Sequence, residues 1–422
     1  MFKAVAGYYK DNERLRLLVK IIAVWLISRA VMLLMVPVMN LIADEPHQWL
    51  YYMNPWDAEW YKGIVENGYQ PPKSSGMASW AFFPLYPLVC MAVRLVTMES
   101  IDTYAVGMTV SNICIIIAVY YAVKYADIEL DMKKYNKKTV EDIIIFLMLA
   151  GPFAVYYGAM YTEALFILCV ILCFYNSARH NYMAAGIAAA MASATRIVGC
   201  MLVFVLITYM FMETCAECRA KHNSEMKDNK EAGIIDKCML TEEAGILIAG
   251  NISLASVIRT FIKNVIKEPK KLVAIMISPL GIFIYMNYLR YFCGDSWAFY
   301  HVQRAWRTQK MFPVIGVLFK SCTGQLSAAS GVKTLNGIIL GWLCVITLML
   351  YAAMIRKKHY ALGIFGIIVL LIPLTSSVMS TLRFIMGSFV IYIGVAEIIA
   401  GCNRYVRYGI CLLYTSPSPR DA

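Results

Sequence analysis

Long apolar runs separated by short polar turns dominate the chain. The runs fall at residues 19–39, 80–97, 103–125, 143–160, 163–178, 183–212, 272–291, 335–356, 360–378 and 383–402. Most are close to the roughly 17–25 residues that a helix needs to cross the hydrocarbon core of a bilayer. Because the turns between them are short and charged, the pattern predicts an all-α, polytopic membrane protein.

The run 183–212 is too long for one upright pass at about 1.5 Å per residue. Arg196 and Gly199 lie near its middle. A turn at residues 195–199 would divide the run into two short passes.

The run 80–97 is short and contains Pro84 and Pro87, which remove backbone donors and kink or break helices. If this run crossed the membrane, the lysine cluster at 133–138 would lie outside, against the rule that basic turns stay in the cytoplasm. We therefore expect 80–97 to form a juxtamembrane or re-entrant helix.

Composition and charge support the same class. The 422 residues are 60% hydrophobic and 16% charged, with a net charge of +12. Soluble domains carry about 45–50% apolar and about 25% charged residues, which argues against a water-soluble enzyme, a disordered protein and a nucleic-acid binder. Basic residues before the first helix place the N-terminus in the cytoplasm. The later basic segments that fall on the same side are 133–138, 179–180, 213–271, 356–358 and 404–407.

This topology places the unusual polar residues on the external face. They are Asp57 with Glu59, Tyr161 with Glu163, Arg196, residues 297–307, and Ser380 with Arg383. Charge near or inside a membrane is costly and suggests function. We therefore expect these groups to form one site, next to a first external segment, 40–79, that is net acidic.

The first external loop holds two carboxylates. On a helix, Asp57 and Tyr61 share one face. Trp56 and Trp60 share the neighbouring face, so an aromatic anchor would hold a carboxylate at the membrane interface. Two other interpretations stay open: Asp57 as a helix N-cap, and the tryptophans as an ordinary aromatic belt. Glu59 lies two residues from Asp57, a spacing at which helical side chains do not face each other.

Two charged residues interrupt the apolar middle of the chain. Glu163 follows Tyr161 at the head of a predicted transmembrane helix, where a glutamate also complements the helix dipole. Arg196 lies between two apolar half-passes, where its planar fork suits a phosphate or a carboxylate. A structural ion pair between Glu163 and Arg196 and the capture of a phosphate group are both open interpretations.

The segment 293–307 is rich in aromatic residues. Rings together with an amide resemble a sugar-binding surface, although an interfacial anchor would show the same residues. The candidate binding residues here are Trp297, His301, Gln303 and Trp306. Farther along, Arg383 places a cation at the external start of a helix, against the dipole preference, which favours an anionic partner such as a lipid phosphate.

Several short motifs connect these residues to a known family. They are Trp56-Asp57-Ala58-Glu59, Gly68-Tyr69, Ala81-Phe82-Phe83-Pro84, Tyr161-Thr162-Glu163-Ala164-Leu165-Phe166, Ala194-Thr195-Arg196 with Gly199, and Ala298-Phe299 with Gln303 and Trp306. Together they resemble the PIG-V family of GPI mannosyltransferases, in order over about residues 20–400 and in a bacterial-type form. The resemblance is specific in the first loop and at 151–199 and weaker after 290.

The resemblance implies a GT-C-like helical bundle. Its expected parts are a seven-helix catalytic module at 1–291, with an external loop at 40–102 and a cytoplasmic polar segment at 213–271, and an external loop with variable C-terminal helices at 292–411. Part of the polar segment, 244–267, could lie on the membrane as an amphipathic helix. Residues 412–422 look like a non-native tail translated from sequencing-adaptor DNA.

The resemblance also implies an activity: transfer of mannose from a polyprenyl-phosphate-mannose donor to a lipid-linked or cell-surface acceptor, with inversion. The expected catalytic residues are Asp57, as general base, and Glu59. The expected substrate-binding residues are Trp56, Tyr61, Tyr161, Glu163, Arg196, Trp297, His301, Gln303, Trp306 and Arg383. The scheme implies no metal or other cofactor, although a divalent cation is compatible with it.

The expected partners are the sugar donor, membrane lipids and a glycan or glycolipid acceptor. The site would face outward from the plasma membrane of a bacterium or into the lumen of the endoplasmic reticulum of a eukaryote. Two other classes stay open: a transporter or flippase of lipid-linked sugars, and a non-catalytic subunit of a glycosylation complex.

Overall fold

The computed structural model describes residues 12–42, 48–72, 76–231, 253–305, 313–325, 334–375, 378 and 381–402. Within these ranges every regular element is helical, which confirms the predicted all-α class. Up to Arg196 the elements are α2 (Glu13–Ile42), α3 (Trp49–Met53), α4 (Ala58–Asn67), η1 (Ser79–Ala81), α5 (Leu85–Val96), α6 (Thr103–Glu129), α7 (Lys137–Leu149), α8 (Ala154–Gly158), α9 (Glu163–Ala178) and α10 (Tyr182–Ser193).

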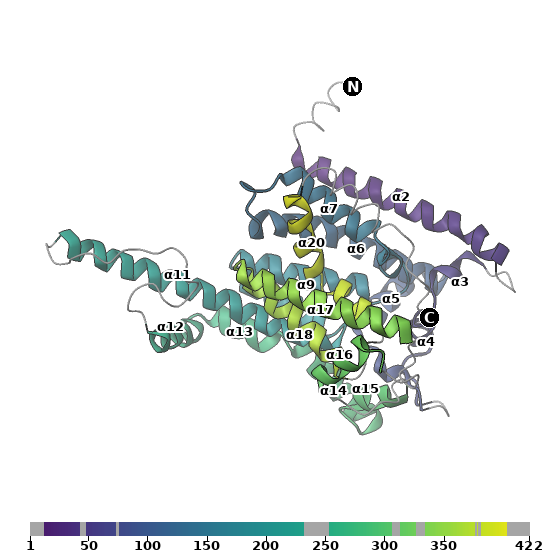
Figure 1. Ribbon diagram of the computed structural model, residues 1–422. Helices are drawn as coiled ribbons and strands as arrows, with labels where there is room; N and C mark the ends of the chain where they lie inside the picture. The colour runs from purple at the N-terminus through teal and green to yellow at the C-terminus, as the bar shows by residue number, and fades with distance from the viewer. Residues whose placement is uncertain are drawn as a thin grey trace.

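The later elements are also helical. They are η2 (Ile197–Met201), α11 (Leu202–Glu231), α12 (Leu254–Lys267), α13 (Pro269–Ile277), α14 (Leu280–Cys293), α15 (Ala298–His301), η3 (Val302–Ala305), α16 (Val314–Cys322), α17 (Thr334–Arg356), α18 (Tyr360–Leu374), α19 (Thr381–Gly387) and α20 (Val390–Gly401). Most of the long helices run in roughly one direction in Figure 1, as expected for a membrane bundle.

Of the described helices, four contain stretches long and apolar enough to cross a membrane: α2, α6, η2 with α11, and α17. Two helix pairs could each form a further span with a bend, by 42° between α13 and α14 and by 72° between α19 and α20. Side chains of α2 such as Leu26, Ile27 and Leu34 are exposed along the edge of the bundle, where lipid would cover them. These features confirm the prediction of a multi-pass membrane protein.

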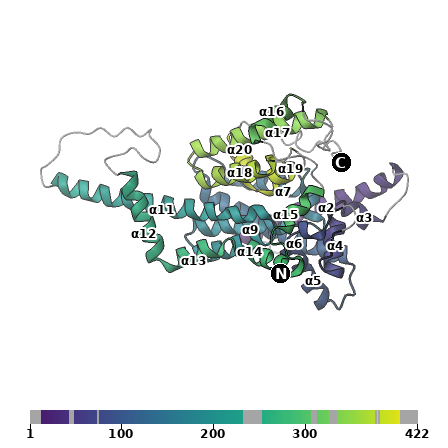
Figure 2. The same ribbon diagram turned by 90° about the horizontal axis from the view of Figure 1, so that it is seen from below.

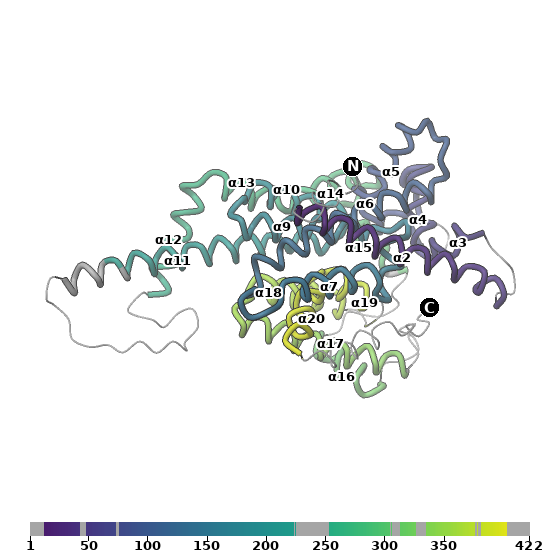
Figure 3. The backbone as a smooth tube through the Cα atoms, turned by 90° about the horizontal axis from the view of Figure 1, so that it is seen from above, coloured from purple at the N-terminus to yellow at the C-terminus, as the bar shows by residue number. Residues whose placement is uncertain are grey.

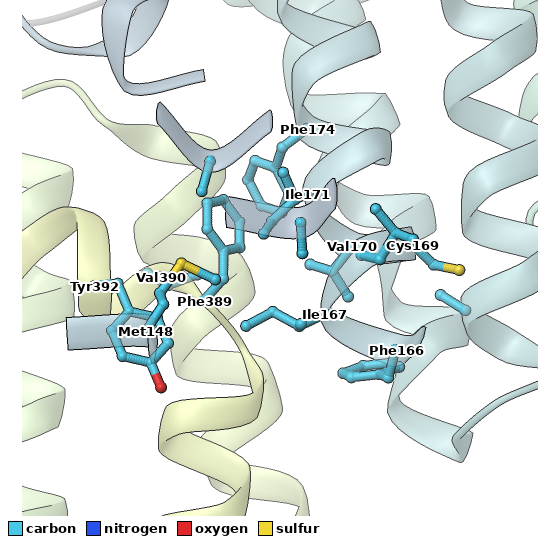
Figure 4. Packing of buried hydrophobic residues seen from close by; sticks show 14 of the residues in the cluster. Met148, Phe166, Ile167, Cys169, Val170, Ile171, Phe174, Phe389, Val390 and Tyr392 are labelled. Carbon is cyan, nitrogen blue, oxygen red and sulfur yellow. The ribbon is translucent and has the colours of Figure 1, made fainter. Parts of the chain in front are cut away.

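Helix α9 forms the centre of the core. Nearly all of its side chains are buried, and it packs against α6 and α10. Figure 4 shows Phe174 and Ile167 of this helix near Phe389 and Val390, where α19 leads into α20. The rings of Phe174 and Phe389 lie 5.2 Å apart between centroids. The C-terminal helices thus lie beside α9 (Figure 3). Glu163, the first residue of α9, contacts Arg383 of α19.

The predicted break in the run 183–212 is confirmed. Helix α10 ends at Ser193, Arg196 is extended (φ −154°, ψ 147°), and η2 begins at Ile197. The second part is not a short pass, however, because α11 continues to Glu231, well into the segment predicted to be polar and cytoplasmic. The added stretch is rich in Glu, Lys and Ala, which favour helix without requiring burial.

The run 143–160 does not form one helix, contrary to the expected single pass. Helix α7 ends at Leu149 and α8 begins at Ala154. Gly151 and Pro152 lie between them, and a proline removes a backbone donor and disfavours helix in the residue before it. The break turns the short helix α8 toward the head of α9.

The run 80–97 forms the 12-residue helix α5. At about 1.5 Å per residue it is about 18 Å long, well short of the roughly 30 Å hydrocarbon core. Pro84 is its N-cap and Pro87 lies in its first turn, where a missing backbone donor costs little. Its length agrees with the expected juxtamembrane or re-entrant helix.

We predict that Gly199→Ala destabilises the protein. A Cβ atom at Gly199 would lie 2.3 Å from the backbone carbon and oxygen of Ala192, at the turn that separates α10 from α11. Backbone cannot move aside as a flexible side chain can, so we expect a loss of roughly 1–3 kcal/mol. Thermal unfolding of the purified protein measures it. The control is Gly316→Ala, where nothing lies within 4 Å of the added carbon; equal midpoints for the two variants would contradict the prediction.

Candidate active site

Four charged side chains from distant parts of the chain meet at one end of the bundle. Arg383 is central: its Nη1 lies 2.6 Å from Oδ2 of Asp57, and its Nε and Nη2 lie 2.8 and 2.6 Å from Oε1 of Glu163. Arg196 approaches the same glutamate oxygen, with Nη1 at 2.8 Å. We call these four residues the charge cluster. The predicted pair of Glu163 and Arg196 therefore exists, but as part of a larger set.

The loop before α4 positions Asp57. Its backbone N–H donates to the hydroxyl of Tyr161 (3.1 Å), which donates to the carbonyl of Pro55 (2.5 Å). Trp56 has a φ of 51°, in the left-handed region that a bulky residue rarely adopts. Asp57 occupies the N-cap position of α4, but its side chain makes no cap hydrogen bond. The interpretation of Asp57 as a helix cap is therefore wrong; the side chain binds Arg383 instead.

Glu163 is the first residue of α9, as predicted, and its side chain is fully buried. One oxygen, Oε1, receives all the contacts from both arginines. Within the described residues, the other oxygen, Oε2, has no hydrogen-bond partner. Burial of a charge is tolerated only where opposite charges compensate it, so Glu163 depends on the two guanidinium groups.

Aromatic rings flank both arginines. The guanidinium of Arg196 lies 5.7 and 5.6 Å from the ring centroids of Phe166 and Phe384. That of Arg383 lies 5.5 and 5.2 Å from those of Tyr156 and Tyr161. Cation–π contacts of this kind hold a guanidinium plane in a fixed orientation. Tyr156 was missed at the sequence level, although it belongs to the same Gly-Pro-Phe-Ala-Val-Tyr-Tyr stretch that leads to Glu163.

Exposure increases from one side of the cluster to the other. The side chain of Glu163 is 0% exposed, that of Arg383 is 20% exposed and that of Asp57 is 31% exposed. Next to Asp57, Trp56 is 60% exposed and stacks on Tyr156, with ring centroids 6.4 Å apart. The most accessible carboxylate thus lies beside an open aromatic surface, a combination suited to a ligand with both polar and apolar faces.

The residues that follow Asp57 in the sequence contact different parts of the protein. Glu59 is exposed and accepts a hydrogen bond from Tyr104 of α6. Trp60 stacks on Phe82, so the expectation that it shares a face with Trp56 is wrong, because Trp56 lies outside the helix. Tyr61 is buried, as its helical position suggests, and its hydroxyl lies 3.3 Å from that of Thr162. Burial, together with the carboxylates of Glu163 and Asp57, raises the pKa of Tyr61.

The aromatic segment after α14 lies near the cluster without joining its ion pairs. Phe299 is buried against Phe83 and Tyr285, and Ile197 packs on the same group. Trp297 is 52% exposed and Gln303 is half-buried, whereas Trp306 lies outside the described residues.

His301 is exposed, and its Nδ1 lies 2.7 Å from Oδ2 of Asp295. This contact lowers the pKa of the Asp295 carboxyl. Over the part of the chain that the structure describes, no group of three or more His, Cys, Asp or Glu side chains is arranged to hold a metal ion.

Fold and site together define a multi-pass helical membrane protein in which one buried and one partly exposed carboxylate pair with two arginines at one end of the bundle. The chain belongs to the mannosyltransferase (PIG-V) family, whose model matches residues 15–234. This confirms the resemblance seen in the motifs. The match includes Asp57, Glu163 and Arg196, whereas Arg383 lies beyond it.

Two solved structures of an oligosaccharyltransferase from Archaeoglobus fulgidus are similar to this chain. One is AglB in complex with an inhibitory peptide and a dolichol-phosphate (11% identity, TM-score 0.47), and the other carries a tethered acceptor peptide (13% identity, TM-score 0.44). Each comparison covers 96% of this chain and 54% of the archaeal one, so the chain spans about half the length of these proteins. A search of curated protein sequences finds no significant match.

We predict that Glu163→Gln destabilises the protein strongly. The substitution leaves Arg196 and Arg383 without the buried charge that compensates them, and breaking a buried ion pair costs about 3–5 kcal/mol. Thermal unfolding in detergent measures the effect. Glu99→Gln is the matched control, because Glu99 forms an exposed pair with Arg94 that contributes at most about 1 kcal/mol. Similar midpoints for both variants would show that Glu163 does not hold the cluster together.

Proposed function

We propose that the protein transfers mannose from a polyprenyl-phosphate-mannose donor to a hydroxyl group of a lipid-linked or cell-surface acceptor on the external face of the membrane. Family membership supports the sugar and the class of reaction. The observation that carries the mechanism is the charge cluster, in which the partly exposed carboxylate of Asp57 lies beside two arginines.

In this scheme Asp57 is the general base. It takes the proton of the acceptor hydroxyl, whose oxygen forms a bond to C1 of mannose as the bond from C1 to the phosphate oxygen breaks. The direct displacement inverts C1 and releases polyprenyl phosphate. Asp57 fits this role better than Glu163 because its side chain is 31% exposed, whereas Glu163 is fully buried. A positioned base contributes about 10²–10⁴-fold to the rate.

The arginines provide the positive charge that the departing phosphate needs. Arg383 uses Nε and Nη2 to hold Glu163 and Nη1 to bind Asp57. A donor phosphate would compete for Nη1, while Glu163 keeps the guanidinium in place. Donor binding would then free Asp57 from its ion pair at the moment when a base is needed. Arg196 would stabilise the phosphate charge from the other side.

The aromatic residues give the sugar and the acceptor their surfaces. Trp56, stacked on Tyr156, would contact the apolar face of the mannose ring. Trp297, His301 and Gln303, which lie close to the buried Phe299 in the sequence, would contact the acceptor. The distribution of basic residues supports the external location of the site. Glu59 would act only as a more distant companion of Asp57.

We predict that Asp57→Asn lowers the turnover number by about 10²–10⁴-fold, because the amide cannot accept the proton. Donor binding should become tighter, because the carboxylate that competes with the donor phosphate for Nη1 of Arg383 is gone. The measurement is transfer of radiolabelled mannose from a polyprenyl-phosphate donor by the purified protein in detergent. Glu99→Gln, a neutralised carboxylate in the same external region, is the control. Turnover near that of the unsubstituted protein would remove Asp57 from the mechanism.

The same assay separates the other two classes. A flippase would move the labelled lipid across a vesicle membrane and form no glycosylated product. A non-catalytic subunit would show neither activity alone. Product formation by the purified protein is therefore the decisive result for an enzyme.

We predict that Arg383→Lys lowers turnover by about 10²-fold or more. Lysine keeps the charge but cannot contact Glu163 and Asp57 at once, since it lacks the planar fork. Loss of one fixed donor at a developing charge typically costs about 10²–10³-fold. Arg94→Lys, at a half-buried arginine that pairs with the exposed Glu99 in the external region, is the control. If both variants retain full turnover, the fork of Arg383 plays no part in the reaction.

A further inference from the structure

Helix α12 carries three rows of side chains, each with a spacing of four residues. One row, with Val257 and Val265, is buried. The second row is apolar but exposed, and consists of Leu254 (46%), Ile258 (42%), Ile262 (51%) and Ile266 (65%). The third is basic and exposed, and consists of Arg259, Lys263 and Lys267. Residues four apart lie on one face of a helix, so the exposed apolar row runs between the buried row and the basic row.

The buried row attaches α12 to the bundle. Phe261 meets Phe211 of α11 with ring centroids 5.7 Å apart, and Asn264 donates to Glu217 of α11 (2.9 Å). These contacts leave the row through Ile262 uncovered by the described residues. Four large aliphatic side chains exposed in line need an apolar cover, as the exposed side chains of α2 do.

Helix α12 lies where the chain enters the bundle again. Only Glu268 separates it from α13, which with α14 can form a bent span. Near the start of α13, buried Lys271 contacts Glu213 (3.0 Å), which accepts a hydrogen bond from Tyr182 (2.8 Å). Because Tyr182 begins α10 and the turn with Arg196 follows the end of α10, this junction lies at the end opposite the charge cluster.

Figure 2 and Figure 3 show α12 running across the long direction of α11 and α13. A helix that lies across the spans at one end of a bundle lies parallel to the membrane surface.

We infer that α12 is a lipid-binding helix that lies in the headgroup layer at the end of the bundle opposite the charge cluster, and that it binds anionic phospholipids. The row through Ile262 would enter the boundary of the acyl chains. The row through Lys263 would contact the phosphates, helped by Lys270 at the start of α13. Basic amphipathic helices bind anionic membrane surfaces in this way. The inference is independent of the sugar-transfer reaction.

Charge complementarity selects lipid over a second copy of this chain. The exposed basic row contains no acidic residue to pair with an identical row, and each Lys or Arg next to an anionic surface strengthens binding about fivefold. The long stems of Lys and Arg also let their charged ends reach the phosphates while the neighbouring aliphatic side chains lie deeper, among the acyl chains.

The first test compares lipid affinities. The full chain is titrated with phosphatidylglycerol and with phosphatidylcholine, and bound lipids are counted by native mass spectrometry. In the triple variant Arg259→Gln/Lys263→Gln/Lys267→Gln we expect at least a tenfold loss of phosphatidylglycerol affinity and no change for phosphatidylcholine. The control is Lys133→Gln/Lys134→Gln/Lys138→Gln, which removes the same charge from another exposed turn. Equal losses in the two variants, or no loss in the first, would overturn the inference.

The second test locates the apolar row and does not depend on charge. A benzophenone amino acid replaces Ile262 in one variant and Ser224, on the exposed part of α11, in another. Both variants are placed in lipid nanodiscs and irradiated. We expect a phospholipid adduct at position 262 and none at 224. Crosslinking of position 262 to this chain or to a second copy, in place of lipid, would show that protein covers the row.

Discussion

The pairing of one buried carboxylate with two guanidinium groups is the interaction on which the rest of the site depends. Glu163 has no exposed surface, and an isolated charge there would cost several kcal/mol. Arg383 and Arg196 compensate it, and each is held between aromatic rings that restrict its orientation. The partners belong to α9, to the turn after α10 and to α19. Electrostatic compensation therefore fixes how these segments meet.

Asp57 contacts Arg383 from the more exposed side of the charge cluster. Among the described residues it forms one ion pair, with Arg383, and its backbone is held by Tyr161, two residues before Glu163. The catalytic candidate thus has a fixed main chain and a side chain that a competing anion can release. The strained φ of Trp56 fits the same arrangement, because it lets the indole leave the helix and stack on Tyr156 beside the open carboxylate.

Local patterns were enough to predict the membrane class, the break at Arg196 and the position of Glu163 at the head of a helix. Each depends on nearby residues: apolar periodicity, a charge between two half-passes, or an acidic residue before a hydrophobic run. The break at Gly151-Pro152 also had a local signal, which the length of the apolar run outweighed.

The contact of Asp57 with Arg383 had no such signal, since 326 positions separate the two residues and either one could serve as a cap or an interfacial charge. Only tertiary packing decides such a contact. The extension of α11 did have a local signal in its Glu, Lys and Ala residues, which favour helix, but the polar character of the segment outweighed it in the prediction.

The distance along the chain between Asp57 and Arg383 has a consequence for biosynthesis. Helices that enter a membrane one after another would leave Asp57, Glu163 and Arg196 in place long before α19 is made. Until then Glu163 and Arg196 can pair, but neither Asp57 nor Glu163 has Arg383 as a partner. On the proposed mechanism, a nascent or truncated chain would therefore lack one of the two arginines that bind the donor phosphate. Synthesis of the last helices would then be the step that makes the site reactive.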